Sequence, residues 1–273
     1  NYSSDVDLIF VCAGDDYHDR DMHARQEDVA EQIRRFNRAM EENTEHGFLY
    51  RVDLKLRPWG RSGALVLSVD QTEHYYEAST EAWERFAWLR ARIIAGNPAL
   101  GEDLLERLQP FIYLRTLGSD DLQRFIDIKG QMARQRQRQG SWNVKLGEGG
   151  IRDIEFFIQV LQAVNASARP RLKTTNTMDA LQELVREGFV ATEDGRMIQD
   201  AYLFLRRLEN HLQMMDEQQT HQLPDQYEHR IKVASSLGFG PGSESRTVEE
   251  FNRALERHRN IARSCFERIL PAT

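Results

Sequence analysis

The chain has 273 residues, of which 40% are hydrophobic and 29% are charged. These proportions are typical of a soluble globular protein with a sizeable core, and no apolar run is long enough to cross a bilayer. The net charge of −7 argues against a general nucleic-acid binder, and two cysteines are too few for a disulfide framework. We therefore expect a cytoplasmic protein that binds neither nucleic acid nor membrane.

Two acids lie in the first predicted strand. Residues 5–10 read DVDLIF, a run whose β-branched and aromatic residues favour a strand. Successive strand side chains point to opposite faces, so Asp5 and Asp7 project from the same face. Carboxylates held this close repel each other unless a proton or a cation lies between them, and Mg²⁺ prefers oxygen ligands. An isolated pair of this kind is more often a strand-edge or turn feature without a function.

A polar helix is predicted from about residue 21 to residue 43, and a second strand follows at residues 48–58. In that strand Asp53, Lys55 and Arg57 share one face with strict alternation. If it pairs with the first strand, Asp53 adds a third carboxylate and its neighbours add charge for phosphate. Three acids and several bases on paired strands are typical of a two-metal nucleotidyl or phosphoryl transfer site.

The turn at residues 57–63 carries Arg57 and Arg61 beside Asp53, which suits contact with phosphate. The alternative is a surface hairpin loop whose arginines are merely solvated. Residues 64–68 read as a further strand, so three strands around one helix predict a compact α+β unit.

The chain from residue 69 onward has helical periodicity almost throughout. We expect helices at residues 73–95, 120–139 and 248–269, and a helix-packing seam between residues 198 and 215. The helix at 120–139 is basic, but it lacks stacking aromatics, which favours a solvated or partner-facing surface. Around the 198–215 seam, Arg206, Arg207, Glu209 and His211 are predicted to lie on the flanks.

A glycine-rich loop at residues 143–150 opens a further predicted helix. Backbone amides at a helix N-terminus can hold an anion, and Lys145 and Arg152 would add charge, although such a loop is also an ordinary turn. Asp153 lies in the first turn, where an acid suits the helix dipole whatever its function. Glu155 lies beside the apolar seam, so it is either a structural acid paired with an arginine or a supporting group near the metals.

Three runs together resemble one enzyme family: SSDVDLIF at residues 3–10, RVDLKLRPWGRSG at 51–63 and KLGEGGIRDIEF at 145–156. Their order and spacing are similar to those of the glutamine synthetase adenylyltransferase/adenylyl-removing enzymes, within the nucleotidyltransferase superfamily. The resemblance implies an α+β fold: a small nucleotidyltransferase-type mixed sheet in a catalytic region at 1–115, then a helical bundle at 116–273. The superfamily's glycine-rich segment before the first catalytic strand is absent, so we expect an N-terminally truncated fragment.

The resemblance also implies a reaction. The pair Ser3-Ser4 before the acids and the Lys145-Leu146 run look like the half that removes adenylyl groups, using phosphate to release ADP from an adenylylated tyrosine of glutamine synthetase. Asp5 and Asp7 are expected to bind both Mg²⁺ ions and Asp53 one of them. The expected phosphate- or nucleotide-binding residues are Ser4, Lys55, Arg57, Arg61, Lys145 and Arg152, with Asp153 and Glu155 as supporting groups.

The implied partners are glutamine synthetase as substrate, the PII signalling protein as regulator, and phosphate, ADP or ATP as small ligands. Two alternatives stay open. The chain is instead the half that attaches the adenylyl group from ATP, in which Asp53 could serve as a base. Otherwise it is a non-catalytic regulatory or interaction module of the same enzyme.

Overall fold

The computed structural model describes residues 4–13, 20–78, 82–113, 141–216, 220–240 and 243–268, with residues 123, 126, 127 and 130. The chain folds as two compact units. One is formed by residues 4–113 and the other by the chain from residue 114 onward. No helix within these ranges is long and apolar enough to cross a membrane.

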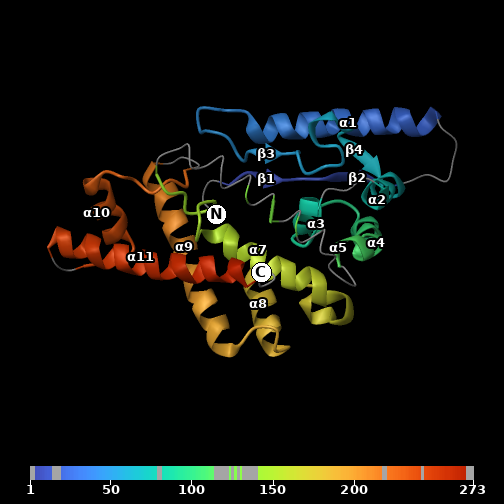
Figure 1. The fold of residues 1–273 in the computed structure, drawn as a ribbon. Helices are drawn as coiled ribbons and strands as arrows, with labels where there is room; N and C mark the ends of the chain where they lie inside the picture. The colour runs from blue at the N-terminus through green and yellow to red at the C-terminus, as the bar shows by residue number, and fades with distance from the viewer. Residues whose placement is uncertain are drawn as a thin grey trace. The chain divides into compact units, whose positions relative to one another are not determined.

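Four short strands form the centre of the 4–113 unit. They are β1 (Val6–Asp7), β2 (Phe10–Cys12), β3 (Val52–Asp53) and β4 (Val66–Ser68). β1 pairs with β3 and β2 pairs with β4, both in parallel. Figure 1 shows helix α1 (Arg20–Glu41) running along these strands, with Ala30 and Ile33 buried against Val66.

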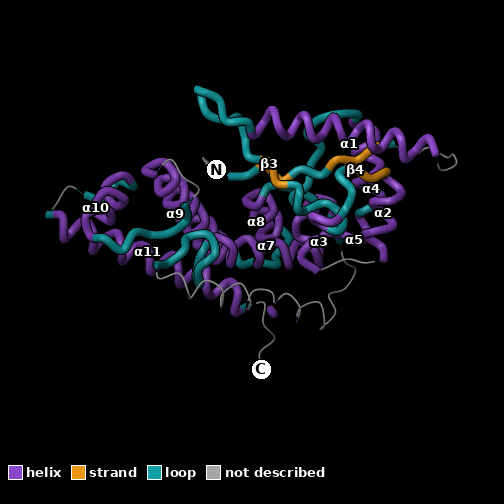
Figure 2. Tube along the Cα trace, turned by 90° about the horizontal axis from the view of Figure 1, so that it is seen from above, coloured by secondary structure: helices purple, strands orange, loops and turns teal. Residues whose placement is uncertain are grey.

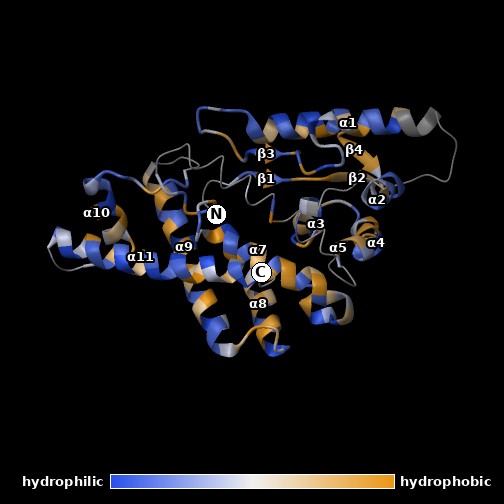
Figure 3. Ribbon diagram, in the orientation of Figure 1, coloured by the Kyte–Doolittle hydropathy of each residue, from blue (hydrophilic) through white to orange (hydrophobic). Residues whose placement is uncertain are grey.

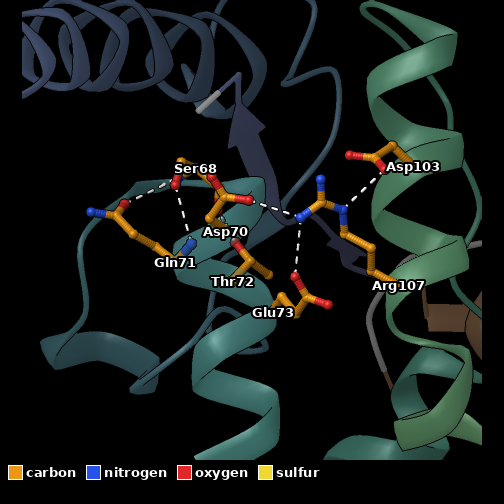
Figure 4. A network of polar contacts seen from close by, with 7 residues as sticks. All are labelled: Ser68, Asp70, Gln71, Thr72, Glu73, Asp103 and Arg107. Carbon is orange, nitrogen blue, oxygen red and sulfur yellow. Dashed lines mark hydrogen bonds and ion pairs between the residues drawn. The ribbon is translucent and has the colours of Figure 1, made fainter. Parts of the chain in front are cut away.

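The other helices of this unit follow β4. They are α2 (Val69–Ala78), α3 (Ala82–Trp88), α4 (Pro98–Arg107) and α5 (Gln109–Ile112). Ser68 and Gln71 cap the start of α2 reciprocally: Gln71 N donates to Ser68 Oγ (3.1 Å) and Ser68 N to Gln71 Oε1 (3.0 Å). Figure 4 shows this cap beside Arg107 of α4, which pairs with Asp70 (2.8 Å) and Glu73 (3.1 Å) of α2.

The α+β class is confirmed, but the predicted elements are shorter in this unit. The strand expected at 5–10 is interrupted between β1 and β2, and the one expected at 48–58 pairs only at Val52–Asp53. The single helix expected at 73–95 is wrong, because α2 and α3 are separate helices. Tyr76 and Trp88 have ring centroids 5.3 Å apart, whereas twelve residues of continuous helix would separate them by about 18 Å.

The second unit is helical. It contains α7 (Ile151–Asn165), α8 (Thr177–Arg186), α9 (Thr192–Asp216), α10 (Tyr227–Ser236) and α11 (Glu244–Glu267), with short 3-10 turns at Ala166–Ala168 and Pro170–Leu172. α7 packs against α8, α9 and α11, and much of it has the colour of apolar residues in Figure 3, whereas much of α11 is hydrophilic. Figure 2 shows only helices and loops for the described residues of this unit.

The predicted seam of α9 is confirmed from Ile198 to Leu212, whose apolar members are buried, while Met215 is half exposed. Glu209, predicted on a flank, is fully buried, and that expectation is wrong. The helices expected near 21–43 and 248–269 correspond to α1 and α11. The basic helix expected at 120–139 lies almost wholly outside the described residues.

Candidate functional site

The two predicted acidic strands lie side by side. Asp7 of β1 is opposite Asp53 of β3, and the bond from Leu8 N to Asp53 O (3.0 Å) belongs to this parallel pairing. Opposed residues of paired strands point to the same face, and Asp5 precedes Asp7 by two residues. The backbone therefore directs three carboxylates to one face of a two-stranded ribbon.

Two of these acids are neutralised by cations of the same ribbon. Arg51 Nε lies 2.8 Å from Asp5 Oδ1, and Lys55 Nζ pairs with Asp53 Oδ2. Lys55 N also donates to Asp53 Oδ1 (2.8 Å). With the carboxylates turned to these partners, the described residues contain no cluster of three metal-ligating side chains. Asp7 itself is exposed.

The pKa of Asp53 lies below its ordinary value. Burial of the carboxyl group alone would raise this pKa, but the hydrogen bonds and charge of Lys55 and the charge of Arg61 outweigh it. Asp53 is therefore a stable anion and a weak proton acceptor. Ser4, half-buried, directly precedes Asp5.

Arg57 supports the turn that follows β3. Its Nη1 donates to Leu54 O (2.8 Å), its Nε to Gly63 O (3.2 Å) and its Nη2 to Arg61 O (3.2 Å). The alternative of a merely solvated arginine is thus wrong for Arg57, whose guanidinium group holds the turn together. Arg61 is exposed and within electrostatic range of Asp53.

The same turn needs backbone conformations that few residues can adopt. Trp59 has a left-handed φ of 57°, which is uncommon for a residue other than glycine. Its ring packs edge-on against Tyr75, with centroids 4.6 Å apart. Gly63 has no room for a side chain, since a Cβ there would lie 2.0 Å from Pro58 O. The local sequence therefore fixes the position of Arg61 relative to β3.

In the helical unit, the loop before α7 is held by its own hydrogen bonds. Asn143 Oδ1 accepts from Lys145 N (3.0 Å) and Leu146 N (2.8 Å). The first amides of α7 also have partners: Ile151 N donates to Val144 O, Arg152 N to Lys145 O and Asp153 N to Gly150 O. The prediction that amides at this helix start hold an anion is wrong for these three groups.

The charged side chains near this loop have different surroundings. Asp153 is buried and accepts from Gly149 N (2.8 Å), so it caps the loop. Glu155 is half-buried, accepts from Tyr202 Oη (3.3 Å) and lies 3.8 Å from Arg152. Lys145 is half-buried, and its ammonium group has no ion pair or hydrogen bond with the described part of the chain.

Sequence reasoning missed a buried polar cluster on α9. Glu209 is fully buried, 2.9 Å from Arg206 and 3.1 Å from His221 Nδ1. Burial would raise the pKa of Glu209, but His221 and the charges of Arg206 and Lys145 lower it below its ordinary value. A signal was present, because Glu209 follows Leu205 by four residues, a spacing that puts both on one helix face.

Two family models match the chain. Residues 1–107 match the model for glutamate-ammonia ligase adenylyltransferase, and residues 124–270 match the model for GlnD PII-uridylyltransferase.

Curated relatives cover the same ranges. Three of them, all named bifunctional glutamine synthetase adenylyltransferase/adenylyl-removing enzyme, come from Thioalkalivibrio sulfidiphilus, Stenotrophomonas maltophilia and Nitrosococcus oceani. Their identities are 38%, 40% and 36%, over 100%, 88% and 100% of this chain. The alignments cover 28%, 26% and 28% of the relatives' own lengths. The chain thus spans little more than a quarter of these proteins.

Proposed function

The chain belongs to the family of bifunctional glutamine synthetase adenylyltransferase/adenylyl-removing enzymes, and from this premise we propose that it removes adenylyl groups from glutamine synthetase by phosphorolysis. Phosphate would take the adenylyl group from a modified tyrosine, giving ADP and unmodified glutamine synthetase. The observation that carries the proposal is the register of Asp7 with Asp53, which brings the acids of two separate motifs to one face.

The chemistry of the donor set suits Mg²⁺, because the carboxylates of Asp7, Asp53 and the preceding Asp5 are hard oxygen ligands, which Mg²⁺ prefers. In this structure Asp5 and Asp53 are paired with Arg51 and Lys55, so metal binding requires these two carboxylates to exchange partners. In this proposal Asp5 and Asp7 bind both ions and Asp53 binds one. When bound, the metal neutralises the phosphoryl oxygens of the reacting group.

The residues of the chain have their own tasks in the reaction. A phosphate oxygen bonds to the adenylyl phosphorus as the bond to the tyrosine oxygen breaks, and that oxygen takes a proton. Because two phosphate groups must approach each other, cations that offset their charge are needed. In the 4–113 unit we assign this task to Arg61, with contributions from Ser4 and Lys55. In the helical unit we separately assign phosphate binding to Lys145, with a contribution from Arg152. Arg57 would act by closing the turn that carries Arg61.

Removal makes the smaller demand on a general base, because attachment needs a base for a tyrosine hydroxyl. Inorganic phosphate is already an anion and needs no such base. Attachment remains the second candidate, because the model matched by residues 1–107 is named an adenylyltransferase.

The decisive experiment incubates the chain with adenylylated glutamine synthetase and Mg²⁺, with and without phosphate, and follows ADP. We expect phosphate-dependent ADP, and we expect Asp7→Asn to lower its rate by at least roughly a hundredfold. The matched control is Asp28→Asn, an exposed acid on α1, which should leave the rate unchanged. Wild-type rates in Asp7→Asn would refute the assignment of the acids.

The same preparation separates the other functions. ATP-dependent labelling of unmodified glutamine synthetase, without phosphate-dependent ADP, would identify the attaching half. Binding of glutamine synthetase or of a PII-type regulator without either turnover would identify a non-catalytic module.

A further inference from the structure

We infer that Glu209 is a positioning residue, which sets the loop at residues 141–150 and thereby the ammonium group of Lys145. The inference rests on the proposed function in one respect, the assignment of Lys145 to phosphate. It adds a residue from a different helix, α9, to which the sequence had assigned only a place on the flank of the helix-packing seam. Glu209 would touch no substrate and would act through the loop.

Burying the carboxylate of Glu209 in the core of the helical unit costs free energy. Its side chain is 0% exposed and lies between Arg206 (2.9 Å) and His221 (3.1 Å). A buried carboxylate is costly unless partners compensate it, and removing one partner leaves an uncompensated charge. Neighbouring seam positions of α9 hold leucine, so packing alone does not require an acid here.

His221 connects this acid to the loop. Its carbonyl oxygen accepts from Val144 N (2.8 Å), directly before Lys145. Asn143 and Gln222 form an antiparallel bridge next to it, and Leu223 N donates to Trp142 O (2.9 Å). The segment at 221–223 thus runs antiparallel to residues 142–144 and is joined to them by backbone hydrogen bonds. Fixing His221 therefore fixes the backbone directly before Lys145.

The charge of Lys145 also acts on Glu209. Lys145 is among the groups that lower the pKa of Glu209, after His221 and Arg206. The two side chains are therefore close enough to attract each other, although they form no ion pair.

α11 holds the other side of the same loop. The guanidinium group of Arg259 stacks over Trp142 at 4.5 Å, and Arg263 Nε lies 3.0 Å from Glu148. Gly149 lies so close to this helix that a Cβ would be 2.6 Å from Arg259 O. The loop is clamped between α11 and the 221–223 segment, a rigidity expected where one side chain must be placed accurately.

The first test is Glu209→Gln in the full chain, which keeps the side-chain volume and removes the charge. We expect faster hydrogen exchange at amides of residues 143–150, and a roughly ten- to hundredfold higher KM for phosphate with kcat changed far less. The matched control is Glu183→Gln. Glu183 is a partly buried acid of α8 that pairs with Arg186 rather than with any residue of the loop. This control should change neither quantity.

A double-mutant cycle with Lys145→Ala tests whether Glu209 acts through Lys145. In the Lys145→Ala background, Glu209→Gln should no longer change the KM for phosphate. Additive effects, or an unchanged KM and unchanged loop exchange in Glu209→Gln, would overturn the inference. If Glu209→Gln does not fold, His221→Asn gives the same test, because it removes the link between the acid and the loop.

Failure of the proposed function has a different signature. If the wild-type chain shows no phosphate-dependent ADP, the proposed reaction fails, while loop exchange still reports whether Glu209 positions residues 143–150. If ADP forms but Lys145→Ala is as active as wild type, only the assignment of Lys145 and the inference built on it are wrong.

Discussion

At the scale of single residues, Asp53 combines a structural and an electrostatic role. Its Oδ1 accepts from Lys55 N, two residues ahead, which is an Asx turn and ends β3 directly after the acid. Its Oδ2 pairs with the Lys55 ammonium group. The Asp53 side chain thus ends the strand through one oxygen, and its pair with Lys55 through the other oxygen stabilises its ionised form.

The Lys55 pair predicts a definite pH dependence. Because the folded pKa of Asp53 is lowered, its ionised form stabilises the fold above the ordinary value of 3.8, and this contribution is lost as pH falls through the folded pKa. In Lys55→Gln we expect the pKa of Asp53 to rise and the stability at neutral pH to fall by about 0.2–1 kcal/mol. NMR titration of the carboxyl carbon and urea unfolding measure the two quantities.

The control for this pair is Lys232→Gln, an exposed lysine of α10. It should alter neither the Asp53 titration nor the acid dependence of unfolding. An Asp53 pKa that stays low in Lys55→Gln would show that Lys55 does not cause the shift.

Residue patterns predicted that the acidic strands exist but predicted neither their length nor the buried charges. Alternation is a local property, and the two strands that it indicated pair with Asp7 opposite Asp53, over two residues only. The burial of Glu209 depends on His221, twelve residues along the chain, and on the packing of α9. A charged residue at seam spacing signals such a partner, but the partner's identity is set by tertiary structure.

At the scale of elements, the turn after β3 depends on one glycine. A Cβ on Gly63 would overlap Pro58 O, so Gly63→Ala must open the turn that Arg57 closes. We expect a loss of about 1–3 kcal/mol in unfolding free energy, together with lower phosphorolysis because Arg61 is displaced. Urea unfolding and the ADP assay measure these effects.

Gly47→Ala provides a matched comparison in the same unit. Its φ is +86°, and no atom lies within 4 Å of an added Cβ, so it reports the cost of the left-handed backbone alone. This cost is about 1 kcal/mol. Activity should survive in Gly47→Ala, and equal losses of activity in both variants would argue against a specific role for the turn.

The type of an element was predictable where its apolar periodicity extends over many residues. The ends of the elements were not predictable. α1, α9 and α11 have enough turns for their apolar spacing to be unambiguous. The strands pair over only two or three residues, because turn chemistry such as that of Asp53 ends them. Tyr76 of α2 packs on Trp88 of α3, a contact that periodicity along the chain does not reveal.

At the scale of the whole molecule, each unit has its own core. The 4–113 unit buries Ala30, Ile33 and Val66 between α1 and the strands. The helical unit buries Leu205, Leu208 and their neighbours on α9. Units with separate cores can unfold in separate transitions. The tryptophans can distinguish these transitions, since Trp59, Trp83 and Trp88 lie in the first unit and Trp142 in the second.

Leu205→Ala tests this independence. Leu205 is 0% exposed, so its truncation should destabilise the helical unit by about 2–5 kcal/mol. Leu203→Ala on the same helix is the control, because Leu203 is 45% exposed and should lose far less. We expect the part of the far-ultraviolet circular dichroism change that comes from α7 to α11 to move to lower urea, while the tryptophan fluorescence transition, dominated by the 4–113 unit, stays in place. If both signals move together, the two units unfold as one cooperative structure, and a change in either would then affect the acids of β1 and β3 as well.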